Sequence, residues 1–184
     1  MMKIDARVRY TKMIIKKCFA DLLTMKPIRK VTVTDICEAA EINRATFYRY
    51  YDNPYDLMEK IEDELSERFF NEIAPLPSSD IKGRLVIIMR EMKKEPDFYQ
   101  ALFSENGDPS YLNKCLVLVY KDSSVYLHER YTELSLEKQE YLFYFIALGG
   151  ASVISQWVKN RMRTSVEETA EFLEHVISAT LDNI

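Results

Sequence analysis

The sequence predicts an all-α fold of about nine helices, and three observations support it. Apolar residues recur at helical spacing through nearly all of the 184 residues, of which 47% are hydrophobic. Only four glycines and six prolines are present, too few for the many turns of a β-sandwich. No segment alternates as a half-buried strand does, and no apolar run reaches the roughly 18 residues of a membrane span. We therefore expect a sizeable helical core and no membrane partner.

The first three helices are expected before residue 52. Apolar residues repeat at helical spacing over residues 8–22, and this helix should end near Lys26-Pro27, because the residue before a proline disfavours the α conformation. Thr32 and Asp35 have the spacing of a capping box, which predicts the start of a short second helix. The third should begin at Asn43, a good N-cap, and continue to about residue 51. The short gap between the second and third helices predicts a tight helix-turn-helix.

The remaining helices have start signals of their own. Asn53, Pro54 and Asp56 occupy N-cap, N1 and N3 positions of a fourth helix that should run to about residue 74. Ser165 and Glu168 have capping-box spacing before the last helix. The other helices are expected over residues 80–94, 96–105, 109–131 and 136–162.

Charge divides the chain into a basic head and an acidic body. Residues 1–52 hold eleven Lys or Arg and six Asp or Glu, a net charge of +5, whereas residues 53–184 hold fourteen and twenty-three, a net charge of −9. A basic head suits a polyanionic partner such as nucleic acid, and the alternative is chance segregation of charge. We therefore expect a binding head at 1–52, linked through the helix at 53–74, and a second domain at 53–184.

Catalysis, metal binding and cofactors find little support in the sequence. His128 and His175 each stand among Glu and apolar residues, and no HExxH, CxxC, GxSxG or phosphate-binding glycine loop is present. We expect no catalytic residue, no metal site and no cofactor. Three cysteines without CxxC spacing are typical of reduced thiols in a cytoplasmic protein, and early charged residues argue against a signal peptide.

A helical wheel drawn from Asn43 separates two faces of the third helix. Phe47, Tyr50 and Tyr51 form an apolar face that can anchor the helix. The major groove of DNA is wide enough to admit one such helix. On the face turned to the DNA, arginine can pair with guanine and hydroxyl groups can reach phosphates, while alanine leaves room for a thymine methyl group. The alternative is an ordinary solvated amphipathic helix. The opposite face carries Arg44, Ala45, Tyr48 and Arg49, with Thr46 at its border.

The segment from Thr32 to Tyr51, followed by Asp56-Leu57-Met58, resembles the TetR family of bacterial transcriptional regulators. The resemblance covers residues 8–70 and implies a cytoplasmic, all-α homodimer. In this family the N-terminal helices bind a palindromic operator in double-stranded DNA, and the C-terminal helices bind a small-molecule or protein effector. The resemblance implies DNA contacts for Thr32, Thr34, Asn43, Arg44, Ala45, Thr46, Tyr48 and Arg49.

Two positions depart from the family pattern. Glu41 stands where the family usually has the turn glycine, and a residue other than glycine at positive φ costs on the order of 1 kcal/mol. Pro54 stands where the family usually has a lysine that contacts phosphate. We expect the helix N-terminus capped by Asn53 to meet a phosphate instead, through its dipole and free N–H groups.

The acidic body carries the candidates for effector binding and dimerisation. Aromatic residues between 98 and 157 either line an effector pocket or belong to the core, and their helical spacing favours the core for most of them. Candidates for a pocket are Tyr99, Phe103, Tyr120, Tyr144 and Trp157. The apolar stripe of the last helix should pack against the preceding helix and, as the resemblance implies, against copies of both. Candidates for the dimer interface are Gly149, Gly150, Val166, Ala170, Leu173, Val176, Ile177 and Leu181.

The sequence thus predicts a DNA-binding regulator, and a repressor released by its effector is favoured over an activator. The net charge of the body favours a neutral or cationic amphipathic effector, or a protein partner. A protein-interaction module of the same fold remains the alternative, whereas a small helical enzyme would lack any convergent set of titratable residues.

Overall fold

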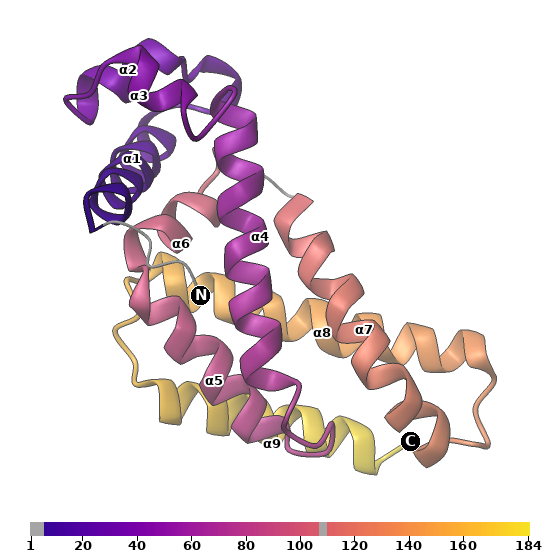
Figure 1. Ribbon diagram of the computed structural model, residues 1–184. Coiled ribbons are helices and arrows are strands. Elements are labelled where there is room, and N and C mark those ends of the chain that lie inside the picture. Colours follow the sequence, from indigo (N-terminus) through magenta and orange to yellow (C-terminus); the bar gives the residue numbers. More distant parts are fainter. Residues whose placement is uncertain (1–5, 107–109) are drawn as a thin grey trace. The chain divides into compact units, whose positions relative to one another are not determined.

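The computed structural model describes residues 6–106 and 110–184, and every regular element in these two ranges is a helix (Figure 1). The predicted all-α fold is confirmed, and the expected count of about nine is close to the nine α-helices and one 3₁₀ helix observed there. The expected helix start at Pro109 lies outside the described residues. The elements are α1 Ala6–Met25, η1 Ile28–Lys30, α2 Val33–Ala39, α3 Arg44–Tyr48, α4 Pro54–Ile73, α5 Ile81–Lys94, α6 Pro96–Leu102, α7 Ser110–Arg130, α8 Leu136–Lys159 and α9 Val166–Asp182.

Local capping explains several of these boundaries. The Thr32 hydroxyl accepts a hydrogen bond from the Asp35 N–H at 3.1 Å, and the Asp35 carboxylate accepts one from the Thr32 N–H at 2.7 Å, so the capping box of α2 is complete. Ser165 caps α9 by accepting a hydrogen bond from the Glu168 N–H. α3 is shorter than expected, because a turn in which the Tyr50 and Tyr51 N–H groups both bond to the Phe47 carbonyl replaces its last residues.

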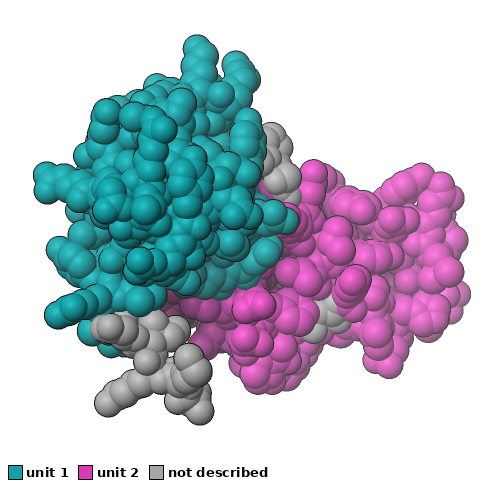
Figure 2. All heavy atoms as spheres, turned by 45° about the horizontal axis from the view of Figure 1, so that its top comes forward, with its two compact units in different colours: residues 1–65, 95–108 teal, residues 66–94, 109–184 magenta. Residues whose placement is uncertain are grey.

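The chain forms two compact units (Figure 2). Unit 1 comprises residues 1–65 and 95–108, and unit 2 comprises residues 66–94 and 109–184. Helix α4 contributes to both units, because the division falls after Leu65. The domain boundary after residue 52, which the charge distribution suggested, stays a prediction.

Unit 1 has a core built from α1, α2, α3, α6 and the first part of α4. Helix α1 packs against α2 and α6. The fully buried side chains of this core come from α1, α2, α3 and α4, which holds the short α3 in one place. They include Ile15, Phe19, Leu23, Ile36, Phe47, Leu57 and Ile61.

Unit 2 has a core in which α5 packs against α9 and α7 packs against α8. Leu127, Leu142, Phe143 and Leu181 form one buried cluster from three of these helices. The buried side of α9 includes four residues of the apolar stripe that the sequence singled out, so α9 is a core helix of this unit. They are Val166, Ala170, Leu173 and Leu181.

By length and composition alone, α8 is apolar enough to cross a membrane, the one such helix in the described residues. No membrane span was expected from the sequence, because α8 contains no uninterrupted apolar run of about 18 residues. One face of α8 packs into the core of unit 2, where Phe143, Ile154, Trp157 and Val158 are buried. Burial of one face and polar caps at Ser135 and Asn160 fit a core helix of a bundle.

Candidate nucleic-acid interface

The third helix is anchored by its aromatic residues and by its cap. Phe47 is fully buried and Tyr51 is 3% exposed, with their ring centroids 5.6 Å apart. At the N-terminus, the Asn43 side-chain oxygen accepts hydrogen bonds from the Thr46 N–H at 2.7 Å and from the Thr46 hydroxyl at 2.9 Å. The anchoring face predicted for Phe47 and Tyr51 is therefore present, whereas Tyr50 is only half-buried and has the Lys12 ammonium 5.7 Å from its ring centroid.

The opposite face of α3 is open to solvent. Together with the C-cap Arg49, this face offers a small methyl group, two guanidinium groups and a phenol. Such groups read base edges and phosphates in a major groove. Tyr48 has 53% of its surface exposed. Thr46 is half-buried because its hydroxyl belongs to the cap. The exposed candidates are Asn43, Arg44, Ala45, Tyr48 and Arg49.

Thr34 and Arg44 meet across the turn between α2 and α3. The Arg44 guanidinium donates a hydrogen bond to the Thr34 hydroxyl, with Nη2 and Oγ1 2.6 Å apart. Arginine has five N–H donors, so this bond holds the guanidinium while leaving donors for a base or a phosphate. The sequence named both residues as DNA contacts but gave no sign of the bond, which depends on the angle between two helices.

Thr32 lies beside an ion pair. The Lys26 ammonium is 2.8 Å from the Asp35 carboxylate, which also accepts hydrogen bonds from the Thr32 N–H and hydroxyl. The bond from Lys26, followed by those from Thr32, lowers the pKa of Asp35 to about 2. The carboxylate is therefore ionised at neutral pH, and a phosphate approaching Thr32 meets a neutralised pair rather than bare positive charge.

The expectation of free N–H groups at the start of α4 is wrong. The Asn53 side-chain oxygen accepts hydrogen bonds from the N–H groups of Tyr55 at 2.9 Å and Asp56 at 3.0 Å. The Leu57 N–H bonds to the Asn53 carbonyl, and Pro54 has no N–H to offer. A phosphate contact here would have to use the exposed Asn53 side chain itself or the phenol of Tyr55, which is 55% exposed.

The turn between α2 and α3 keeps the backbone geometry that glycine favours. Glu41 has φ of 52°, and the Ile42 N–H closes the end of α2 by bonding to the Cys37 carbonyl at 3.0 Å. The glutamate thus takes the left-handed conformation expected at this position, with the strain that a Cβ adds there.

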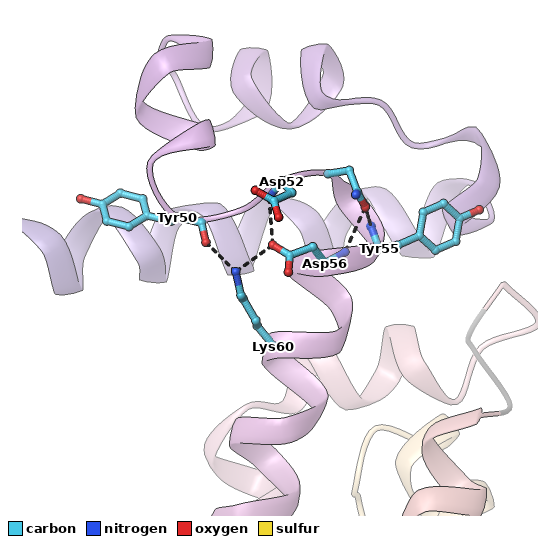
Figure 3. Close-up of polar contacts among 6 residues, drawn as sticks. Tyr50, Asp52, Tyr55, Asp56 and Lys60 are labelled. Atoms are coloured by element: carbon cyan, nitrogen blue, oxygen red, sulfur yellow. Dashed lines mark hydrogen bonds and ion pairs between the residues drawn. The ribbon is translucent and has the colours of Figure 1, made fainter.

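Lys60 joins the end of the recognition segment to α4 (Figure 3). Its ammonium donates hydrogen bonds to the Tyr50 carbonyl at 3.1 Å and to the Asp56 carboxylate at 2.9 Å. The same carboxylate accepts a hydrogen bond from the Asp52 N–H at 2.9 Å. The bond from Lys60 lowers the pKa of Asp56. Lys60 was not predicted from the sequence, although its spacing of four residues from Asp56 on one helix was a readable signal.

The candidate pocket residues divide between the two units. In unit 1, Tyr99 is buried and stacks against Phe103, with ring centroids 6.5 Å apart. In unit 2, the Tyr120 and Tyr144 rings stack at 6.4 Å, and Trp157 is buried. The Trp157 indole N–H donates to the Thr164 carbonyl at 2.9 Å. The core alternative is met by five of the twelve aromatic residues between 98 and 157, which are buried, whereas Tyr144 is 42% exposed. An effector pocket stays a prediction.

No metal site is evident in the part of the chain that the structure describes, because no three His, Cys, Asp or Glu side chains there are placed to share an ion.

The candidate dimer residues face in different directions. Val176 is 46% exposed, Gly149 is exposed, and a Cβ added at Gly149 or Gly150 would meet no atom within 4 Å, so these glycines face open space. Ile177 is half-buried. Buried within the chain itself are Val166, Ala170, Leu173 and Leu181.

The structure exposes large apolar side chains on α8 and α9 in addition to Val176. Tyr141 and Phe145 are among the aromatic residues expected to form a pocket or the core, whereas Leu148 and Phe172 were not predicted to have a role. We call these exposed side chains the α8–α9 apolar surface. Large apolar residues four and then three positions apart on α8 were the readable signal. Together with Val176, this surface comprises Tyr141, Phe145, Leu148 and Phe172, which are between 47% and 71% exposed.

Two family models match the chain. The model described as "Bacterial regulatory proteins, tetR family" matches residues 20–61, which include the helix-turn-helix. The model described as "Transcriptional regulator C-terminal region" matches residues 79–179, more than half of the chain.

Individual proteins are similar as well. The HTH-type dhaKLM operon transcriptional activator DhaS of Lactococcus lactis is 34% identical over 98 residues, which are 50% of this chain and 49% of DhaS. The uncharacterized HTH-type transcriptional regulator YxbF of Bacillus subtilis is 28% identical over 153 residues, which are 79% of this chain and 39% of YxbF. The matched parts therefore span half or less of these relatives. A TetR transcriptional regulator from Streptococcus agalactiae shares the fold, with a TM-score of 0.66 at 22% identity over 94% of this chain and 96% of that chain.

Proposed function

Since this chain belongs to the TetR family of bacterial transcriptional regulators, we propose that it binds a palindromic DNA operator as a cytoplasmic homodimer and represses the genes beside it until an effector releases it. One observation carries the proposal: a short α3 anchored by Phe47 and Tyr51 presents Arg44, Ala45 and Tyr48 to solvent. A helix held by one face and polar on the other suits insertion into a major groove.

The α8–α9 apolar surface supports the homodimer. Five large apolar side chains exposed on two adjacent elements of the sequence are unusual for a free surface, and a second copy would bury them. Two copies related by a twofold axis would present two α3 helices to adjacent half-sites, about 34–36 Å apart on DNA. The DNA partner of a dimer is then a palindrome.

Release would follow from a change in the separation of the two heads. The dimer can exist in states that differ in the distance between its two heads. An effector that binds the body more tightly in a state whose heads do not match the operator half-sites shifts the population toward that state. Operator affinity then falls. Helix α4 belongs to both units, so such a change could reach the head through it. The acidic body favours a neutral or cationic effector, or a protein partner. We expect the protein to have no catalytic activity of its own.

A second candidate role is activation. The L. lactis relative at 34% identity is named a transcriptional activator, and its similarity to this chain supports the same role here. In that case the body would dock a protein partner instead of releasing DNA on binding a small molecule. The two roles share the DNA-binding head and differ in what the bound dimer does at a promoter.

The test uses the full chain and a pool of random DNA duplexes. Repeated selection of bound duplexes should enrich a palindrome, and its affinity should fall steeply as salt concentration rises, because bound phosphates release counterions. Selection that enriches no sequence would contradict the proposal. Transcription in vitro from a promoter carrying the selected palindrome then separates the roles: a lower yield supports repression, and a higher yield supports activation.

A further inference from the structure

Lys60 makes three contacts at the end of the recognition segment. Its ammonium donates to the Tyr50 carbonyl at 3.1 Å and to the Asp56 carboxylate at 2.9 Å, and it lies 5.7 Å from the centroid of the Tyr51 ring (Figure 3). Tyr50 and Tyr51 lie in the short segment between α3 and α4, just after the C-cap Arg49, whereas Lys60 stands in the second turn of α4. One side chain thus connects two elements that the chain joins only through an irregular segment.

Asp56 completes the connection from the other side. Its carboxylate accepts hydrogen bonds from Lys60 and from the Asp52 N–H, so the backbone is fixed both at the Tyr50 carbonyl and at the Asp52 amide. Helix α3 spans only Arg44–Tyr48, too short to hold its own direction. Its direction therefore depends on the buried Phe47 and Tyr51 and on what is attached to its C-terminal end.

The ammonium is also committed to a partner of opposite charge. Asp56 lies within hydrogen-bond distance and offsets the charge of Lys60, and the Tyr50 carbonyl takes a second of its three N–H donors. The side chain is half-exposed, but both of these bonds are made to groups of the protein itself. The geometry therefore points to a role in holding α3 rather than in attracting DNA.

We propose that Lys60 is a positioning residue for DNA reading: it fixes the direction of α3 so that the dimer distinguishes its operator from other duplexes, without itself contacting phosphate. This inference rests on the proposed DNA-binding function. It predicts loss of discrimination between sequences with no loss of the electrostatic part of binding.

The test compares Lys60→Met, which keeps the apolar stem, with the unchanged protein. Fluorescence anisotropy measures affinity for the palindrome selected by the unchanged protein and for a scrambled duplex, each at several salt concentrations. We expect operator affinity to fall about 5- to 30-fold, since both subunits lose the connection, while affinity for the scrambled duplex changes by less than about 2-fold. The slope of log K against log [salt] should stay the same.

Two variants serve as controls. Lys60→Arg keeps a cationic donor for Tyr50 and Asp56 and should restore most of the operator affinity. Lys82→Met removes a lysine of similar side-chain exposure, 48% against 51%, that pairs with Glu171 within unit 2, and should leave binding unchanged. Circular dichroism and thermal unfolding confirm that each variant folds.

Three results would overturn the inference while leaving the proposed function intact. The first is equal operator affinity for Lys60→Met and the unchanged protein, and the second is an equal loss of affinity for the operator and for the scrambled duplex. The third is a slope of log K against log [salt] that is smaller by about 0.9 per subunit, which would make Lys60 a phosphate contact. Failure of the unchanged protein to select any duplex would instead contradict the proposed function itself.

Discussion

At the scale of single residues, the hydrogen bond between Arg44 and Thr34 determines how the guanidinium is presented. If Arg44 reads a guanine, Arg44→Ala should cost about 1–3 kcal/mol of operator binding and relax the preference at one base pair per half-site. Thr34→Val removes the acceptor and should relax the preference at the same base pair. Selection from a randomised pool measures both effects.

Thr34→Ser is the matched control, because it keeps the hydroxyl and should keep the preference. If Thr34 contacted only phosphate, Thr34→Val would instead weaken binding to all sequences alike. Unchanged preference in Arg44→Ala would show that α3 is not the reading element.

Glu41 supplies a second prediction at this scale. Its φ of 52° is costly for a side chain with a Cβ, so Glu41→Gly should raise the free energy of unfolding by about 0.5–1 kcal/mol. Glu38→Gly is the matched control, since Glu38 is exposed in the regular part of α2, where glycine should lower that free energy by about 1 kcal/mol. Urea unfolding measures both. Destabilisation by Glu41→Gly would mean that the carboxylate has a role there that outweighs backbone strain.

Asp35 makes the stability of the head depend on pH. Its pKa is lowered from 3.8 to about 2, so the stability it contributes is fully present above pH 3.8 and is lost as the pH falls toward 2. Asp35→Asn should therefore destabilise the protein at pH 6 and have a much smaller effect near pH 2. Unfolding by urea at both values checks this. An equal effect at both values would show that the charge of Asp35 is unimportant.

At the scale of elements, the sequence predicted boundaries better than it predicted faces. Helices α1, α2, α4 and α9 begin or end within one or two residues of the expected positions, because prolines and caps act through neighbours in the chain. The end of α3 was harder to predict. Its last expected residues turn away, and Lys60 holds that turn from ten residues further along, so no local pattern marks it.

The two helices of the dimer candidate show why packing faces were harder to predict. Both sides of α9 carry apolar residues, and periodicity alone does not tell which side α5 covers. The structure assigns Val166 and Leu173 to the core of the chain and leaves Phe172 and Val176 exposed. In the same way, the sequence predicted that Thr34 and Arg44 both contact DNA, but it did not predict the hydrogen bond between them, which depends on how α2 and α3 cross.

At the scale of the whole molecule, the α8–α9 apolar surface predicts the oligomeric state. We expect the protein to sediment as a dimer at micromolar concentration, with more than about 1,200 Å² buried in total. Phe145→Glu places a charge on this surface, where Phe145 is 71% exposed, and should shift the mass toward that of a monomer. Sedimentation equilibrium measures this shift.

Val125→Glu is the matched control, because Val125 is 61% exposed on α7, outside the α8–α9 apolar surface. It should leave the dimer intact. A monomeric mass for the unchanged protein, or an intact dimer in Phe145→Glu, would place the interface elsewhere. The operator affinity of the Phe145→Glu variant should fall as dimerisation is lost, since a monomer reads only one half-site.

Trp157 is the single tryptophan of the chain, and it is buried in unit 2 with its indole N–H bonded to the Thr164 carbonyl. Its emission is therefore an optical signal from one unit alone, and the Lys93 ammonium 6.0 Å from its ring makes it responsive to local charge. Circular dichroism sees the helices of both units. Recorded together during denaturation, the two signals will coincide if the units melt as one body and separate if the head melts by itself.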